Sequence, residues 1–261
     1  MELPLVDVVS QVIGSLAERL APVETESVNV DSVAGRVLAE PLLADRDSPA
    51  LSVSAMDGYA IRLTDLSGGP LPVAATTHAG SPPVSLQPNS AVRIFTGAPV
   101  PVEADCVVRR EDTQEAPDKV EIQIGPTSLR RGQNVRVRGE NVLQGEEILA
   151  TGSLVDSVAM GAIASFAPPQ LTVRRKLRVT ILNTGDELAA AGQPVEDWQI
   201  RDSNGPVLVS WLSRLPWISL TARRQVADEL TTVKRSLQAA LDESDAVILT
   251  GGVSMGDADF V

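Results

Sequence analysis

The sequence predicts an α+β multidomain chain, in which a β-rich inserted domain precedes an incomplete doubly wound α/β domain. Two observations support this prediction. Between residues 59 and 148 the helical period of apolar residues disappears, and short β-like runs alternate with turn clusters. After residue 173 the pattern becomes strand, helix, strand, helix, strand, which is typical of a parallel sheet covered by helices.

The segments that flank the β-rich part are predicted to be helical. Apolar residues recur at helical spacing over Pro4–Leu20, and a proline at the start suits a first helical turn. Asp31–Leu38 is predicted to be a second, short helix with Asp31 as its cap, and a third helix is expected over Ser153–Phe166. The N-terminal helices and a linking domain are therefore predicted to comprise residues 1–44 and 146–172.

The inserted domain is predicted to cover residues 45–145 and to form a small β-barrel or sandwich. Its expected strands are Leu71–Ala75, Ala91–Phe95, Cys106–Arg110, Val120–Ile124 and Asn134–Arg138. The single histidine, His78, stands among threonines, Gly80 and Ser81. We interpret it as a solvated residue at a strand end rather than as a catalytic group.

The α/β domain is predicted to cover residues 173–261. Its expected strands are Leu177–Leu182, Ile218–Arg223 and Ala246–Leu249, and its expected helices are Pro206–Leu215 and Glu229–Leu241. Asp202, Ser203 and Asn204 supply capping chemistry just before the first of these helices. The pattern stops soon after the third strand, so we expect either a fragment or a unit completed from elsewhere.

The composition excludes several classes of function. The net charge of -12 and the 3% aromatic content argue against nonspecific binding to nucleic acid or to an anionic membrane. No apolar run approaches the roughly 18 residues of a membrane span. One cysteine, Cys106, and one histidine exclude a disulfide framework and an ordinary structural zinc site. A reducing, cytoplasmic location is therefore expected.

Two Thr-Gly turns follow strands of the predicted parallel sheet. Thr184-Gly185-Asp186-Glu187 comes after the first strand, and Thr250-Gly251-Gly252 comes after the last. Glycines let backbone N–H groups approach an anion closely, and parallel strands end at the same edge, so the two turns are expected to form one pocket. Carboxylates beside an anion site commonly need a bound cation such as Mg²⁺.

A plainer explanation applies to each of these acids taken singly. Asp186, Glu187 and Asp228 are also what a helix dipole favours near a helix start, and Asp57 in a Met-Asp-Gly turn suits turn formation alone. Arginines of the β-rich part, including Arg136 and Arg138, match the geometry of phosphate and carboxylate groups. Their simpler interpretation is a set of solvated strand faces paired with nearby acids.

Seven short motifs stand out along nearly the whole chain. They are SAMDGYA (54–60), IFTGAPVP (94–101), ADCVVRRED (104–112), VRVRGENV (135–142), ILNTGDEL (181–188), QIRDSN (199–204) and LTGGVSMGDADF (249–260). In this order they resemble the molybdopterin molybdenumtransferases, which insert molybdate during molybdenum cofactor synthesis; the E domain of gephyrin is similar. The resemblance identifies the α/β domain as a molybdopterin-binding domain.

The resemblance implies a substrate, a reaction and an assembly. Relatives bind adenylylated molybdopterin and molybdate, cleave the adenylyl diphosphate link in a metal-dependent step, and release AMP. They are elongated homodimers, with the active site between the pterin-binding domain of one subunit and the inserted domain of the other. The resemblance also implies other proteins of molybdenum cofactor biosynthesis as partners, whereas nucleic acid and membrane are not expected.

The resemblance also implies roles for individual residues. The catalytic set would be Asp57, Thr96, Glu187, Asp228 and Asp259, of which Glu187 and Asp259 would hold Mg²⁺. The residues that bind the molybdopterin part would be Thr184, Gly185, Asp186, Thr250, Gly251, Gly252, Ser254, Arg136 and Arg138. Position 141 is Asn where many relatives carry Asp, which argues against a metal or molybdate role there.

Two alternatives to this activity remain open at the sequence level. Relatives continue well beyond the position of Phe260, so a polypeptide of 261 residues is expected to insert molybdenum weakly or not at all. It would then act as a non-catalytic dimeric scaffold that binds pterin or a partner protein. A molybdopterin adenylyltransferase is disfavoured, because residues 45–150 have no counterpart there.

Overall fold

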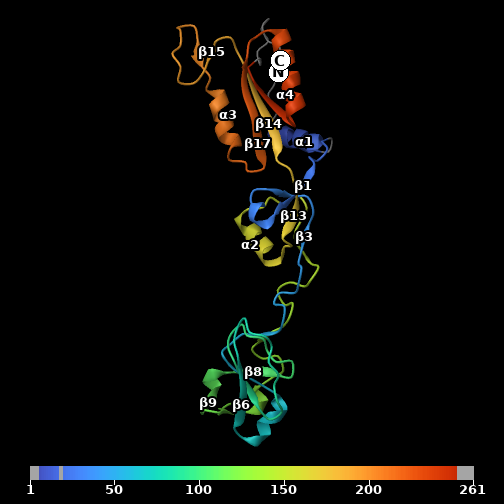
Figure 1. Cartoon of the computed structure of the whole chain (residues 1–261), viewed down its shortest axis with the longest axis vertical. Helices are drawn as coiled ribbons and strands as arrows, with labels where there is room; N and C mark the ends of the chain where they lie inside the picture. Colours follow the sequence, from blue (N-terminus) through green and yellow to red (C-terminus); the bar gives the residue numbers. More distant parts are fainter. Residues whose placement is uncertain (1–5, 18–19, 252–261) are drawn as a thin grey trace. The chain divides into compact units, whose positions relative to one another are not determined.

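The computed structural model describes residues 6–17 and 20–251, which form two compact units (Figure 1). Unit 1 comprises residues Met1–Leu42 and Leu149–Val261, and unit 2 comprises residues Leu43–Ile148. Unit 2 is therefore an insertion into unit 1. The further division of unit 1 into a linking domain and an α/β domain stays a prediction.

Unit 2 is built on a six-stranded sheet with the strand order β8-β5-β7-β6-β10-β9. The strands are β5 (Gly58–Ile61), β6 (Leu71–Thr77), β7 (Ala91–Ile94), β8 (Cys106–Arg109), β9 (Thr113–Glu115) and β10 (Lys119–Ile122). Neighbours are antiparallel, except that β6 and β7 run parallel. Two separate two-stranded sheets are also present. In one, β4 (Val53–Ser54) pairs with β11 (Val135–Arg136), and in the other, β3 (Leu42–Leu43) pairs with β12 (Glu147–Leu149).

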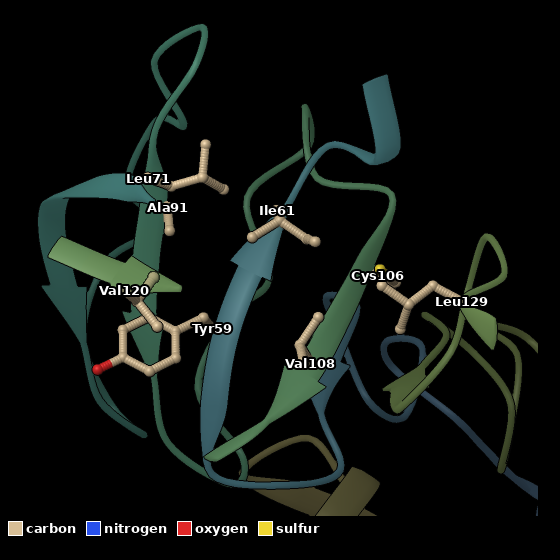
Figure 2. Packing of buried hydrophobic residues seen from close by; sticks show 8 residues of the cluster. All are labelled: Tyr59, Ile61, Leu71, Ala91, Cys106, Val108, Val120 and Leu129. Atoms are coloured by element: carbon tan, nitrogen blue, oxygen red, sulfur yellow. The ribbon is translucent and has the colours of Figure 1, made fainter. Parts of the chain in front are cut away.

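Apolar side chains cover both faces of this sheet, which explains why all four residues of β5 are buried. One cluster contains Tyr59, Ile61 and Val108 (Figure 2), and the other contains Ala60, Val92 and Val107. Successive residues of a strand point to opposite faces, so β5 and β8 contribute to both clusters.

The close approach of β5 and β8 in this sheet requires glycine at position 58. A Cβ atom on Gly58 would lie 1.9 Å from the carbonyl oxygen of Val108, so no larger residue fits there. Cys106 is buried in the same core, and burial raises the pKa of its thiol to about 11. The thiol is therefore protonated near neutral pH and is not a nucleophile.

The predicted strand Asn134–Arg138 is shorter in the structure, where β11 covers only Val135–Arg136. Asn134 has a φ of 56° and Gly139 a φ of 74°, so the backbone turns at both ends. The other predicted strands of unit 2 are confirmed with small changes at their ends.

A small antiparallel sheet in unit 1 joins β1 (Thr25–Asn29), β13 (Gln170–Arg174) and β2 (Val37–Leu38). The helix predicted over Asp31–Leu38 is wrong: a single 3-10 turn over Val30–Ser32 precedes β2. Gly35 has a φ of 74°, which no α-helix accommodates, and Val37–Leu38 pairs with β13 instead.

Two predicted helices of unit 1 are present within the described residues. Helix α1 covers Val6–Ala17, and helix α2 covers Ser157–Phe166. The carboxylate of Asp156 caps α2 by accepting hydrogen bonds from the N–H groups of Val158 and Ala159, at 2.9 and 2.8 Å. This cap explains why α2 begins later than the predicted Ser153.

The remainder of unit 1 is a parallel sheet with the order β17-β14-β18, as the alternating pattern predicts. Its strands are β14 (Leu177–Thr184), β17 (Ile218–Val226) and β18 (Ala246–Thr250), and its helices are α3 (Asn204–Leu212) and α4 (Leu230–Glu243). Helix α3 packs on Val179 and Ile181, whereas α4 packs on Leu182 and Val226, so the helices cover opposite faces (Figure 1). A short pair, β15 (Leu188–Ala189) and β16 (Ile200–Arg201), lies between β14 and α3 in the chain.

No helix of the described part of the chain is both long enough and apolar enough to cross a bilayer.

An ion-pair network joins the starts of two strands in this sheet. Asp245, just before β18, accepts two hydrogen bonds from the Arg175 guanidinium at 2.6 and 2.8 Å, and one from the N–H of Arg178 at 2.8 Å. Arg175 also bonds Glu24, just before β1, at 2.6 Å. The hydrogen bonds from Arg175, followed by those from Arg178, hold the pKa of Asp245 well below its ordinary value.

We predict that Asp245→Ala lowers the free energy of unfolding by about 2 kcal/mol, because the charge-assisted hydrogen bonds from Arg175 and Arg178 to its carboxylate are lost. The pKa of Asp245 is depressed in the folded state. Its contribution is therefore complete above the unfolded pKa of about 3.9 and is lost as pH falls toward the folded value. Urea unfolding between pH 2 and 7 measures both effects, and Asp242→Ala on the exposed side of α4 is the control. Equal stability of the two variants at pH 7 would contradict the assignment.

Candidate functional site

The carboxyl edge of the parallel sheet in unit 1 brings the two Thr-Gly turns together, as the sequence predicts. Strands β14 and β18 are paired so that Asn183 lies opposite Thr250. The Asn183 Nδ2 donates a hydrogen bond to Thr250 Oγ1 at 2.6 Å, and Thr184 Oγ1 donates to the Thr250 carbonyl at 3.5 Å. The turns Thr184-Gly185 and Thr250-Gly251 are therefore direct neighbours.

Packing between the turns requires glycine at position 251. The φ of Gly251 is 97°, and a Cβ there would lie 2.4 Å from both the carbonyl and the hydroxyl oxygen of Thr184. Gly185 has a φ of 147°, and a Cβ there would lie 2.8 Å from Glu187 Oε2. Both glycines are thus needed for backbone geometry, and the lack of side chains also leaves room for a ligand to approach.

Reciprocal hydrogen bonds join the turn that contains Asp186 to the turn that contains Asp228 at this edge. The N–H of Asp186 donates to Asp228 Oδ2 at 3.4 Å, and the N–H of Asp228 donates to Asp186 Oδ1 at 3.2 Å. One oxygen of each carboxylate is used in this way. The interpretation as turn-forming acids therefore accounts for part of their role, while the acids still line the edge where the Thr-Gly turns lie.

An ion pair between buried Asp202 and partly exposed Arg223 fixes the start of α3 near the same edge. Asp202 is almost fully buried; its Oδ1 accepts a hydrogen bond from the N–H of Gly205 at 2.8 Å, and its Oδ2 is paired with Arg223 of β17. Burial raises the pKa of Asp202, but the Gly205 and Arg223 contacts outweigh it and keep that pKa below its ordinary value. The sequence predicted the capping role of Asp202 but not its partner Arg223.

Unit 2 brings Asp57 and Thr96 into direct contact. Asp57 immediately precedes β5 and Thr96 follows β7, and these antiparallel strands pair Gly58 with Ile94. Asp57 Oδ1 accepts hydrogen bonds from the Thr96 N–H at 2.8 Å and from its hydroxyl at 2.7 Å. These bonds, with smaller contributions from Arg110 and Arg93, lower the pKa of Asp57. Asp57 is therefore a fixed, exposed anion near neutral pH.

The two arginines predicted to attract substrate are held in ion pairs. Arg136 pairs with Glu140 and donates to Asn141 Oδ1 at 3.0 Å, and Arg138 pairs with Asp47. The side chains of Arg136 and Arg138 remain 46% and 63% exposed. The simpler interpretation of these arginines therefore accounts for their contacts, and a substrate role stays a prediction.

Three predicted site residues, Gly252, Ser254 and Asp259, lie outside the described residues. Within residues 6–17 and 20–251, no three His, Cys, Asp or Glu side chains converge to hold a metal ion. Mg²⁺ commonly uses only one or two carboxylates together with water and substrate phosphates, so Glu187 and its neighbours supply the right kind of donor. The described residues alone do not form a complete metal site.

Comparisons with known proteins agree with this arrangement. Residues 8–167 match the model of the MoeA N-terminal region (domain I and II), and residues 180–261 match a probable molybdopterin binding domain. The chain belongs to the MoeA family. The family match spans both units, and the second match contains both Thr-Gly turns.

Two curated relatives and one solved structure illustrate the similarity. The chain is 35% identical to a molybdopterin molybdenumtransferase of Haemophilus influenzae, over 92% of this chain and 59% of the relative. It is 33% identical to molybdopterin molybdenumtransferase 2 of Mycobacterium tuberculosis, over 94% of this chain and 62% of that protein. A crystal structure of the molybdopterin biosynthesis MoeA protein from Pyrococcus horikoshii matches with a TM-score of 0.80 and 26% identity, over 93% of this chain and 65% of that one. This chain thus spans about three fifths of the curated relatives.

We predict that Gly251→Ala destabilises unit 1 by about 2 kcal/mol, because the new Cβ overlaps Thr184 and the positive φ disfavours alanine. Gly161→Ala is the matched control, since a Cβ at this helical position meets nothing within 4 Å. That substitution is expected to be neutral or to stabilise by about 0.5 kcal/mol. Thermal and urea unfolding measure both, and equal effects of the two changes would refute the packing argument.

We also predict that Thr96→Val raises the pKa of Asp57 toward its ordinary value. The substitution removes the hydroxyl donor and keeps the N–H donor, which is the larger cause of the lowered pKa, so the rise is partial. Carboxyl-carbon NMR titration measures the pKa directly, and Thr113→Val is the control for loss of a hydroxyl. An unchanged Asp57 titration in the Thr96 variant would remove the hydroxyl as a cause.

Proposed function

We propose that the complete protein is a molybdopterin molybdenumtransferase that inserts molybdate into adenylylated molybdopterin and releases AMP. The observation that carries this proposal is the meeting of two Thr-Gly turns with Asp186, Glu187 and Asp228 at one edge of a parallel sheet. Membership of the MoeA family and the names of its curated relatives support the molybdopterin part of this proposal.

The chain's own groups can perform the binding part of this reaction. Backbone N–H groups of the turn that begins at Gly251 would bind a phosphate of the molybdopterin part, because glycine turns at strand ends let N–H donors approach anions closely. The N–H groups of Gly185 and Asp186 already donate to the Val226 carbonyl and to Asp228, so the Thr184 turn would contribute its other groups. The hydroxyls of Thr184 and Thr250 lie at the same edge. These groups would hold the diphosphate link in one orientation while a water oxygen bonds to one phosphorus and the bond from that phosphorus to the bridging oxygen breaks, which leaves AMP and the phosphate of molybdopterin as separate products.

Glu187, with Asp259, would hold Mg²⁺ against the substrate phosphates. The bound ion would neutralise negative charge that develops on the phosphate oxygens as AMP leaves. Asp186 and Asp228 would position the loop that carries Glu187, since each is bonded to the other's backbone.

Asp57 and Thr96 would supply a second half of the site. Their contact creates an oriented carboxylate on unit 2. We propose a homodimer in which this half serves the pterin-binding half of a partner subunit, in the cytoplasm, with other molybdenum cofactor biosynthesis proteins delivering substrate or accepting product. Arg136 and Arg138, both more than two fifths exposed, would attract the anionic substrate.

A second candidate function is a non-catalytic scaffold that binds pterin or a partner protein. It follows if the polypeptide lacks the part by which the curated relatives exceed this chain. AMP release that depends on both Mg²⁺ and molybdate supports the enzyme, whereas binding of molybdopterin without turnover supports the scaffold.

We predict that Asp259→Ala in the complete protein reduces molybdate-dependent AMP release at least a hundredfold and leaves the dimer intact. Loss of a metal-binding carboxylate removes charge stabilisation from the bond-breaking step. AMP release is followed by chromatography and the dimer by light scattering, with Asp242→Ala as the control for loss of an acid. Unchanged release by the Asp259 variant would exclude this residue from the mechanism.

A further inference from the structure

A polar and aromatic surface lies beside Asp57 and Thr96 on one face of the unit 2 sheet. Strands β6 and β7 are parallel and pair Thr77 with Ile94, so the next residues, His78 and Phe95, emerge side by side. Their rings are stacked, with centroids 4.5 Å apart and planes inclined by 11°. Phe95 is half-buried and His78 is exposed, so the imidazole presents a flat aromatic surface to solvent.

Arg93 belongs to the same face, because it lies two residues before Phe95 on β7. Its guanidinium carbon is 5.6 Å from the centre of the Phe95 ring, which is within the range of a cation–π contact. Its ion pair with Glu115 is long, at 3.9 Å, and the described residues offer Arg93 no hydrogen bond. The Arg93 donors are therefore unused, and its side chain is 35% exposed.

Glu115 is already shared among other partners. It accepts hydrogen bonds from Arg110 at 3.0 Å through each of its oxygens and from the Tyr59 hydroxyl at 3.0 Å. The Tyr59 ring packs in the apolar cluster while its hydroxyl points away from it (Figure 2). Because Glu115 is occupied by Arg110 and Tyr59, it competes weakly for Arg93.

From this geometry we propose that His78, Phe95 and Arg93 form a subsite for a purine nucleotide. The base stacks on the exposed face of the His78 imidazole, and the phosphate takes the unused donors of Arg93. Stacking of bases on aromatic side chains contributes substantially to nucleotide binding, and a guanidinium matches phosphate geometry. The only histidine of the chain thereby gains a role that differs from a merely solvated strand end.

This subsite rests on the proposed function, because it assigns the adenylyl end of the substrate, and later the AMP product, to unit 2. The stack lies next to Asp57 and Thr96, because Phe95 directly precedes Thr96 in the chain. A nucleotide bound there would therefore lie beside the proposed catalytic residues of unit 2. A purely structural stack, which only holds the ends of β6 and β7 together, is the competing explanation.

The experiment measures AMP binding to the complete protein by calorimetry. We expect His78→Ala to weaken AMP binding about tenfold and His78→Phe, which keeps an aromatic ring, to stay within about threefold of the unaltered protein. Ribose 5-phosphate, which lacks the base, should bind both variants and the unaltered protein equally. Arg93→Ala should weaken the binding of both AMP and ribose 5-phosphate. Arg131→Ala removes the same charge at the opposite end of β5, beside Asp105, and should leave the binding of both ligands unchanged.

The outcomes separate the subsite from the reaction. Equal AMP binding by His78→Ala and the unaltered protein, or no AMP binding at all, would overturn the subsite; a loss of thermal stability alone would show a structural stack. If His78→Ala binds AMP as the unaltered protein does and still releases AMP in the molybdate-dependent reaction, the proposed reaction is supported and the subsite is excluded. Weakened AMP binding in a protein that shows no molybdate-dependent AMP release would support the subsite and defeat the reaction.

Discussion

The parallel pairing of β14 with β18 is the constraint on which the candidate site depends. Because Asn183 lies opposite Thr250, both strands end at the same level, and their Thr-Gly turns pack against each other. A one-residue shift would turn the side chains of β18 to the opposite face and separate the two threonines. The packing is close enough that Gly251 has no room for a Cβ atom.

Charged groups fix the surroundings of that edge rather than its centre. Asp245 and Arg175 join the opposite ends of the same strands, and Asp202 with Arg223 fixes the start of α3. A rigid sheet with both faces covered allows the turns to present backbone donors in one geometry, which is what binding of a phosphate requires. In unit 2 the Asp57 and Thr96 pair is fixed in a similar way, by adjacent strands and two hydrogen bonds to one oxygen.

The sequence predicted those features that depend on local pattern. Apolar runs such as Ala246–Leu249 marked the strands of the parallel sheet, and the Thr-Gly turns after them marked its candidate binding edge. The fully buried strand that this run predicts is wrong in one respect, because all five residues of β18 are half-buried. Strand β1 was not predicted, because its sequence, TESVN, is largely exposed and carries no apolar alternation. The helix expected over Asp31–Leu38 does not form, because Val37–Leu38 pairs with β13 and Gly35 has a positive φ, and these constraints outweigh the local helical preference of the segment.

Contacts between distant segments were beyond the sequence pattern. Nothing local to Asp202 indicates that Arg223 neutralises it, and nothing local to His78 indicates that Phe95 lies beneath it. The central claim is that both Thr-Gly turns bind one ligand. Amide hydrogen exchange of the complete protein, with and without molybdopterin, tests it most directly. Slower exchange at both Glu187 and Gly251 on binding is the predicted result, and protection at one turn only, or at neither, would contradict the account.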